Sequence, residues 1–363
     1  MAIKIQMNKS TNNLNKLRIY LRAISKFGKS TLFRNIILEE YDGDASKGLL
    51  CGVGNEIGYT LLDNLQTTHV NNWKDLKELS QFLIKGKGTE HNIEMVCFDV
   101  VDELISIAEK EVCRLSQIQT GKPCDSINKA YSGYGQGQAK VKELIKEYFT
   151  TLYKAGFGIM CISHTKMKTI VEKGKNEDEG YQILTSNLPN TYESIFADIF
   201  DLVLTGIVDK NVVDGKIEST ERRLYFRGTT TLEAGCRFAN DTVPEYLVVD
   251  SDQRQFAKDF LKTIKDGMKN SASNPLTEKE VEESIKEEKK QAEIELQKVQ
   301  QEVEEEQKED EKVSKKELMA QIKDKAQTKE QRTALLEYVK NECNKTKVSE
   351  LTIEELEKAL TLM

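Results

Sequence analysis

The stretch Ala23-Ile-Ser-Lys-Phe-Gly-Lys-Ser-Thr31 follows the strand-like run LRIYLR at 17–22 and precedes the helical sequence LFRNIILEE. A loop that cradles phosphates has the pattern G-x-x-x-x-G-K-[ST] between a strand and a helix. Gly28, Lys29 and Ser30 fit this pattern, and Ala23 stands in the place of the first glycine. Because the strand and the helix are both present, the sequence predicts a phosphate-binding loop here rather than a chance surface turn.

The residue types of this loop explain how it would bind ATP and Mg²⁺. Gly28 allows the backbone to approach the phosphates, and consecutive N–H groups at the helix start supply a positive field. The Lys29 ammonium is expected to reach the β- and γ-phosphates, and the Ser30 hydroxyl to bind Mg²⁺. The predicted cofactor-binding residues of the loop are Lys26, Phe27, Gly28, Lys29, Ser30 and Thr31.

Further strand-like runs alternate with helical patterns along the first 250 residues. These runs lie at 47–53, 94–99, 157–163 and 199–208. The clearest helical pattern covers 138–155. Apolar strands that alternate with helices form a parallel sheet covered on both faces, and two later runs, 222–227 and 245–250, are expected to form an antiparallel edge. The predicted fold class is therefore α/β, with a P-loop and a mainly parallel sheet.

Polar residues follow several predicted strands at their carboxyl ends, where open α/β sheets bind ligands. Asp99 ends its strand and is expected to hold the Mg²⁺ shell. Glu56, in a glycine-rich turn, is either the base that activates water or a solvated loop acid. His164 is either a sensor of the γ-phosphate or a hydrogen-bonded histidine at a strand end. Asp102 and Glu103 either add to the metal shell or cap the following helix.

The chain changes character near residue 267. All 21 glycines lie at or before Gly267, and the 96 residues after it contain one proline and one aromatic residue. Residues 278–312 hold fifteen Asp or Glu against seven Lys, a net charge of −8. Residues 313–363 carry +1, and residues 1–277 are neutral overall. A core with sharp turns is therefore expected to end here, and a helical appendage to follow.

Four capping boxes mark expected helix starts in the appendage. They begin at Thr277, Ser314, Thr328 and Thr352. The first opens the acidic segment, which is either a solvated single helix or charged linker, or a coiled coil. The other three precede short amphipathic runs. The predicted domains are a core at 1–267, a linker with an acidic helix at 268–312, and a small three-helix module at 313–363.

Composition excludes several classes of protein. No apolar run approaches the ~18 residues that span a bilayer, and the first fifteen residues are too polar for a signal peptide. The seven cysteines have no zinc or disulfide spacing and only three histidines accompany them, which indicates reduced thiols and a cytoplasmic location. Because the core is neutral overall, any binding of nucleic acid must depend on local loops.

The ordered motifs of the core resemble those of a known family. They are Lys26-Phe-Gly-Lys-Ser-Thr31, the Glu56 turn, Phe98-Asp99, Gly133-Tyr-Gly135, Ser163-His-Thr-Lys166, and Leu188-Pro189 leading into Ala197-Asp198-Ile199-Phe-Asp201. The set resembles the RecA-like P-loop ATPases of phages and prophages, the AAA-labelled nucleotide-binding proteins linked to Sak-type single-strand annealing systems. The resemblance spans roughly residues 15–250. The family pattern has glycine where this chain has Ala23, and it does not include the helical appendage.

The resemblance implies ATP bound between subunits of a homo-oligomeric ring or filament, and single-stranded DNA held by two mobile loops. The first loop would be 114–138, where Tyr131 and Tyr134 can stack on bases. The second would be 165–187, where lysines can contact DNA phosphates. These lysines are Lys166, Lys168, Lys173 and Lys175. The alternative is that both segments are surface loops without DNA contacts.

The predicted function is an ATP-dependent DNA recombination or repair ATPase, in the host cytoplasm if the chain is phage-encoded. The predicted catalytic residues are Lys29, Glu56, Asp99 and His164. Arg227 and Arg237 are candidates for a cation that completes a neighbouring subunit's site, or they form salt bridges within the chain. One alternative is an ATPase that acts on protein partners, such as a loader or packaging factor. Another is a scaffold that binds nucleotide without turnover, with the tail as its docking arm.

Overall fold

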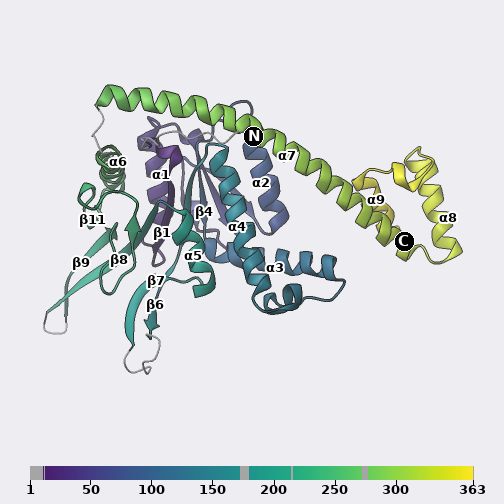
Figure 1. Ribbon diagram of the computed structural model, residues 1–363, viewed down its shortest axis with the longest axis horizontal. Helices are drawn as coiled ribbons and strands as arrows, with labels where there is room; N and C mark the ends of the chain where they lie inside the picture. Colours follow the sequence, from purple (N-terminus) through teal and green to yellow (C-terminus); the bar gives the residue numbers. More distant parts are fainter. Residues whose placement is uncertain (1–10, 12, 172–179, 214–215, 272–276, 363) are drawn as a thin grey trace, which may run out of the picture. The chain divides into compact units, whose positions relative to one another are not determined.

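The computed structural model of this protein describes residues 11, 13–171, 180–213, 216–271 and 277–362. The chain divides into two compact units, residues 1–296 and 297–363. Within the described residues, a nine-stranded sheet forms the centre of the first unit (Figure 1). The strands are β1 (Arg18–Ala23), β2 (Gly48–Val53), β3 (Gln66–Val70), β4 (Met95–Asp99), β5 (Gly158–Ser163), β8 (Leu202–Val213), β9 (Lys216–Tyr225), β10 (Gly235–Cys236) and β11 (Tyr246–Val248).

The strand order is β11-β9-β8-β1-β5-β4-β2-β3, with β10 paired to β8. From β3 to β8 all neighbours are parallel. β1 lies between β5 and β8, so that Leu21 is opposite both Ile162 and Leu204. β9, β10 and β11 pair antiparallel. The α/β fold with a mostly parallel sheet, the architecture of a RecA-like P-loop core, is therefore confirmed, as is the antiparallel edge.

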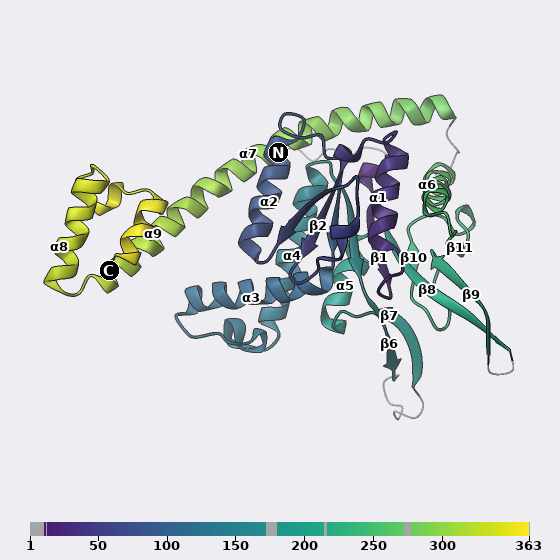
Figure 2. The same ribbon diagram turned by 180° about the vertical axis from the view of Figure 1, so that it is seen from behind.

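Helices cover both faces of the sheet, as a parallel sheet requires. On one face Ile19 and Leu21 pack in a buried cluster with residues of α1 (Lys29–Glu40) and α6 (Gln253–Asn270). On the other face Tyr20 stacks on Phe196 of α5 (Asn190–Ile199). This second face is also covered by α2 (Trp73–Gly86), α3 (Val101–Thr120) and α4 (Gln136–Lys154) (Figures 1 and 2).

Two hairpins extend from the carboxyl edge of the parallel strands (Figures 1 and 2). One is the antiparallel pair β6 (Thr165–Ile170) and β7 (Tyr181–Ser186). The other is formed by β8 and β9, because β8 pairs with β1 only as far as Gly206 and then continues with β9 alone. The segment 165–187, expected to be a loop, is therefore paired as two strands at its ends, and its residues 172–179 lie outside the described residues.

The sequence located most strands of the sheet but missed some elements. The runs predicted at 17–22, 47–53, 94–99, 157–163 and 199–208 became β1, β2, β4, β5 and β8. The strand β3, QTTHV, was missed because its exposed edge position does not select apolar residues. In the first predicted loop, α3 continues to Thr120 and α4 begins at Gln136, with a short 3₁₀ turn at Ile127–Ser132 between them.

The tail is helical, as predicted, but its helices divide differently. α7 (Glu278–Lys325) begins at the Thr277 capping box and continues through Ser314. The predicted helix start at Ser314 is wrong, because no glycine or proline interrupts the surrounding sequence of good helix formers. The boxes at Thr328 and Thr352 do start α8 (Lys329–Glu337) and α9 (Ile353–Thr361). Within the described residues, no helix has both the length and the apolar character needed to cross a bilayer.

The second unit, residues 297–363, has a hydrophobic cluster of its own. Ile322 from α7 packs with Tyr338, Val339, Leu351 and Leu356. All five side chains are buried, although the unit contains no strand among its described residues. This small core allows α8 and α9 to fold against the end of α7.

Candidate nucleotide-binding site

The phosphate loop joins β1 to α1 at the centre of the sheet. Gly28 has φ +104°, a left-handed conformation that favours glycine, and α1 begins at the next residue, Lys29. The buried ring of Phe27 fills the space over Gly206, where a Cβ atom would lie 2.5 Å from the ring. Among the described residues, no side chain caps the start of α1. Uncapped N–H groups at a helix start are the groups that bind phosphate.

Ala23 does not face the phosphate side of this loop. Its side chain is fully buried in the same core cluster as Phe27 and Leu204. A Cβ atom on Gly206 would lie 2.9 Å from the Ala23 methyl, so the two strands approach closely here. Ala23 also lies outside the left-handed region of the backbone. Alanine therefore fits at this position without occupying the space that phosphates need.

The Lys29 side chain is buried at the mouth of the loop. Its Nζ donates to the carbonyl oxygens of Ala23 and Ile24, both at 3.0 Å, and lies 3.5 Å from Nδ1 of His164. Burial lowers the pKa of Lys29, and the charges of Asp99, Asp102 and Glu56 act in the opposite direction. The ammonium is thus held where phosphate oxygens could replace the two carbonyls.

Ser30 and Asp99 bring two oxygen atoms together beside the loop. The Ser30 hydroxyl donates to Oδ2 of Asp99 at 2.5 Å. Burial raises the pKa of Asp99, and the bond from Ser30 offsets part of that effect. Mg²⁺ prefers hard oxygen ligands such as a hydroxyl and a carboxylate. These two side chains therefore fit the magnesium site that the sequence predicts.

Glu56 lies in the turn after β2 and near the same site. Its Oε1 accepts a hydrogen bond from the backbone N–H of Gly58 at 2.8 Å. Its negative charge offsets part of the lowering of the Lys29 pKa by burial and adds to the raising of the Asp99 pKa by burial. β2 needs glycine at position 52, because a Cβ atom there would lie 2.2 Å from the ring of Tyr59, which follows the turn. The structure thus places this carboxylate on the ligand side of the sheet.

His164 connects the phosphate loop to the carboxyl end of β5. Its Nδ1 lies 3.4 Å from the Ser25 hydroxyl and 3.5 Å from Nζ of Lys29. Its backbone N–H donates to Oδ2 of Asp102 at 3.3 Å, while Oδ1 of Asp102 is buried without a hydrogen-bond partner in the described structure. Asp102 therefore faces the site rather than capping α3, whose N-cap is Val100.

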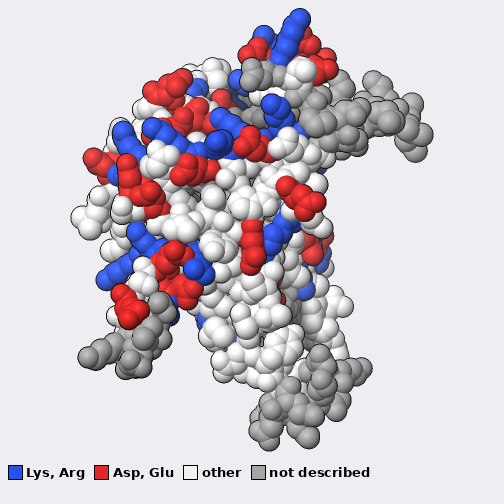
Figure 3. Space-filling view, turned by 90° about the vertical axis from the view of Figure 1, so that its left-hand side faces the viewer, with Lys and Arg blue, Asp and Glu red and all other residues white. Residues whose placement is uncertain are grey.

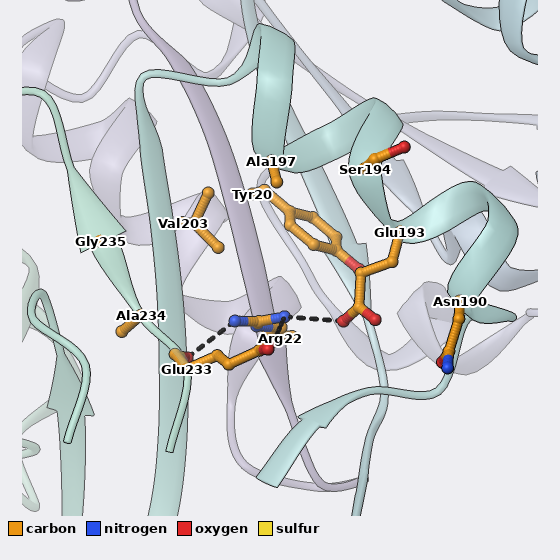
Figure 4. A pocket seen from close by; sticks show the side chains of 10 residues that line it. All are labelled: Tyr20, Arg22, Asn190, Glu193, Ser194, Ala197, Val203, Glu233, Ala234 and Gly235. Atoms are coloured by element: carbon orange, nitrogen blue, oxygen red, sulfur yellow. Dashed lines mark hydrogen bonds and ion pairs between the residues drawn. The ribbon is translucent and has the colours of Figure 1, made fainter. Parts of the chain in front are cut away.

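An arginine missed by the sequence analysis anchors β1 next to this loop. Arg22 is 3% exposed and donates to Thr205, Thr185, Glu193 and Glu233. Figure 4 shows its guanidinium between the two carboxylates, in a cavity of about 420 Å³ that Tyr20 also lines. Glu193 also binds Lys168 of β6 at 2.9 Å. The network joins β1, α5 and the β6–β7 hairpin.

The predicted DNA-contacting residues lie in different environments. Tyr134 is fully exposed and Tyr131 is half-buried, both with positive φ in the segment before α4. Lys166 is exposed on β6. Lys168 is 11% exposed and donates to Glu193 and to the carbonyl of Leu188. The other two predicted lysines, Lys173 and Lys175, lie outside the described residues.

The two candidate arginines for a neighbouring site make contacts within the chain. Arg227 donates to the carbonyl oxygens of Cys236, Phe238 and Ala239. Arg237 is more exposed, forms an ion pair with Asp201 at 3.3 Å and donates to the carbonyl of Asp198. A role for either arginine in a neighbouring subunit stays a prediction.

The charge on the β9 side of the first unit is mixed. Figure 3 shows Lys and Arg interspersed with Asp and Glu over the upper part of this face. The lower part, between two grey segments, is mostly uncharged. This face therefore presents no continuous basic surface among the described residues, which agrees with the neutral charge of residues 1–277.

The loop between the central strand and the first helix, together with Lys29, Ser30 and Asp99, defines a P-loop nucleotide-binding protein. A family model described as an AAA domain matches residues 15–238, more than half of the chain. The chain therefore belongs to this family of AAA-domain proteins. The match extends from before β1 to just after β10, and α6 follows it. A search of curated proteins found no match.

Proposed function

We propose that the protein is a cytoplasmic ATPase that acts as a homo-oligomer on single-stranded DNA in recombination or repair. The observation that carries the ATPase proposal is the convergence of three strand ends on one point. Lys29 and Ser30 follow β1, Asp99 ends β4 and Glu56 follows β2, and these strands run parallel in one sheet. The Ser30 hydroxyl donates to Asp99 at 2.5 Å, and the charge of Glu56 acts on Lys29 and Asp99. The domain family also suggests an ATPase.

Each residue has a defined task in the proposed reaction. The Lys29 ammonium exchanges the carbonyls of Ala23 and Ile24 for oxygens of the β- and γ-phosphates. Ser30 and Asp99 would hold Mg²⁺, which when bound neutralises phosphate charge. Glu56 takes a proton from a water molecule while the oxygen of that water bonds to the γ-phosphorus. The bond from that phosphorus to the bridging oxygen breaks, and ADP leaves.

The β6–β7 hairpin supports the proposal that the ATPase acts on DNA. The hairpin begins at Thr165, directly after His164, whose ring lies 3.5 Å from Nζ of Lys29. It exposes Lys166 on one face of the hairpin and Met167, which is 52% exposed, on the other. A cation for phosphate and an apolar side chain for base contact suit single strands. The resemblance of the core motifs to ATPases of Sak-type annealing systems also supports action on single-stranded DNA.

A second candidate function, an ATPase that acts on a protein partner, is favoured by two observations. Residues 297–363 have their own buried cluster, which suits a docking module. Of the four lysines predicted to contact DNA, Lys168 is already paired with Glu193. In this alternative the nucleotide chemistry is unchanged, and the helical module binds the partner.

The deciding experiment is ATP turnover by the full chain with and without single-stranded DNA. Lys29→Ala is the loss-of-function variant, and Lys110→Ala on the exposed surface of α3 is the control. We expect DNA to raise turnover in the wild type and the control, and Lys29→Ala to lose turnover by orders of magnitude while keeping its fold. ATP turnover that is equal with and without single-stranded DNA favours an ATPase that acts on a protein partner. Nucleotide binding without turnover favours a scaffold.

A further inference from the structure

The backbone of the phosphate loop contacts a residue of β9. One guanidinium nitrogen of Arg222 donates to the carbonyl oxygen of Phe27 at 3.3 Å. Phe27 and Arg222 are 195 residues apart in the sequence. The next residue, Gly28, lies close to Gln253, because a Cβ atom on Gly28 would lie 3.2 Å from the Gln253 Oε1. Gln253 is the first residue of α6, beyond the part of the chain that the AAA-domain family covers.

The sheet register explains why Arg222 reaches the loop. β1 ends at Ala23, which is opposite Gly206 of β8. Arg222 is opposite Val208, two residues farther along β8 and therefore level with the loop that follows β1. Residues two apart in a strand share a face, and Leu224 belongs to the core cluster that packs on α1 and α6. Arg222 therefore lies on the face of the sheet that is covered by α1, the helix that follows the phosphate loop.

The chemistry of this contact favours phosphate binding. The N–H groups that follow Phe27 face an anion in a loop of this kind, so the Phe27 carbonyl points away and needs a donor. Arg222 supplies that donor and a permanent positive charge. Among the described residues, no carboxylate lies within ion-pair distance of Arg222. Its charge is therefore not neutralised by a partner within the described part of the chain.

We propose that Arg222 is a positioning residue for the nucleotide, acting within its own subunit. It holds the Phe27 carbonyl, keeps the loop open for the phosphates, and adds positive charge behind them. The proposal rests on the nucleotide-binding function proposed above and adds a residue to that site. It predicts an effect on affinity for the polyphosphate that exceeds any effect on the chemical step.

The test is the affinity of the full chain for a fluorescent, non-hydrolysable ATP analogue with Mg²⁺, at low and high salt. Arg222→Gln removes the charge but keeps a donor, and Arg222→Lys keeps the charge but loses the planar donor group. Arg223→Gln is the matched control, because Arg223 lies on the opposite face, pairs with Asp209 and stacks on Tyr246. Melting temperatures without nucleotide check the fold of each variant.

We expect Arg222→Gln to raise the dissociation constant about tenfold and to reduce its salt dependence, because a charged donor is lost. Arg222→Lys should be intermediate, and Arg223→Gln should match the wild type. Unchanged affinity in Arg222→Gln would overturn the proposal, as would equal losses in all three variants. If Arg222→Gln does not fold, wild-type affinity in Arg222→Lys overturns it. A wild-type chain that binds no nucleotide contradicts the proposed function instead.

Discussion

The hydroxyl of Ser30 donates a 2.5 Å hydrogen bond to Asp99, although 69 residues separate the two in the sequence. Ser30 follows β1 and Asp99 ends β4, and β5 lies between these strands in the sheet. The contact therefore spans the strand between them at the carboxyl edge. A metal ion held by these two oxygens would connect the helix that binds phosphate to the strand that carries the acid.

Asp99→Asn is expected to stabilise the protein in the absence of metal and nucleotide at pH 7.5. Burial raises the pKa of Asp99 above its ordinary 3.8, so the folded state binds this proton more tightly than the unfolded state does. Wild-type stability therefore falls as pH rises from 3.8 through the raised pKa. A gain of about 2–4 °C in melting temperature would correspond to ~1 kcal/mol.

Thermal unfolding of both proteins between pH 4 and pH 8 checks this expectation. The difference should shrink as pH falls, because wild-type Asp99 then becomes neutral like asparagine. Asp44→Asn is a control in which the change in stability should have the opposite sign. Hydrogen bonds from Ser46 lower the pKa of the exposed Asp44 carboxylate, so the loss of its charge should destabilise the fold at pH 7.5. A variant less stable than the wild type at every pH would mean that the Asp99 carboxylate is stabilising. Magnesium dependence of nucleotide binding should also weaken in Asp99→Asn.

Glu56→Gln is expected to retain nucleotide affinity and lose ATP turnover by about 10²-fold or more, as expected when a general base is removed. The amide oxygen of glutamine can still accept the bond from Gly58, so the turn should keep its shape. Glu90→Gln is the control, because Glu90 is an exposed carboxylate that precedes the amino end of β4. Single-turnover hydrolysis gives the measurement, and normal hydrolysis by Glu56→Gln would place the base elsewhere, with Asp102 the next candidate.

Lys166→Ala and Lys168→Ala should affect different properties, although the two lysines lie on one strand. Lys166 is exposed, so its loss should reduce the salt slope of single-stranded DNA binding by about 0.7. Lys168 is paired with Glu193, so its loss should lower the melting temperature and leave the slope unchanged. DNA titrations at several salt concentrations measure the slope. Equal slopes in Lys166→Ala and the wild type would remove β6 from the DNA site.

A chain that ends after Ser271 should keep the folded core and bind nucleotide. α6 buries Phe256 and Phe260 in the main cluster, and the Ser271 hydroxyl accepts the N–H of Ala239 at 3.0 Å. The truncated chain lacks the segment with net charge −8. It should therefore bind single-stranded DNA at least as tightly as the full chain at low salt, with a smaller difference at high salt. Loss of DNA binding at both salt concentrations would place the DNA site in the tail.

The residues predicted to bind phosphate were recognisable because they are contiguous. A strand, a loop and the start of a helix follow one another between residues 17 and 40. The hydrophobic periodicity of the strand and the helix, and the glycine of the loop, are patterns of residues close together in the sequence. The same reasoning located Asp99 and Glu56 at strand ends. The strand β3 was not predicted, because its exposed position at the sheet edge leaves no apolar pattern. The helix start predicted at Ser314 was wrong, because α7 continues through the capping-box pattern there.

The sequence by itself determined the phosphate loop, the α/β class and the helical tail, since each depends on residues within a few turns of one another. Only the tertiary structure decided which strand ends meet. The order β9-β8-β1-β5-β4 brings Arg222 to Phe27 and Asp99 to Ser30, across 195 and 69 residues. Local periodicity carries no information on strand order, because that order follows from how whole helices and strands pack together.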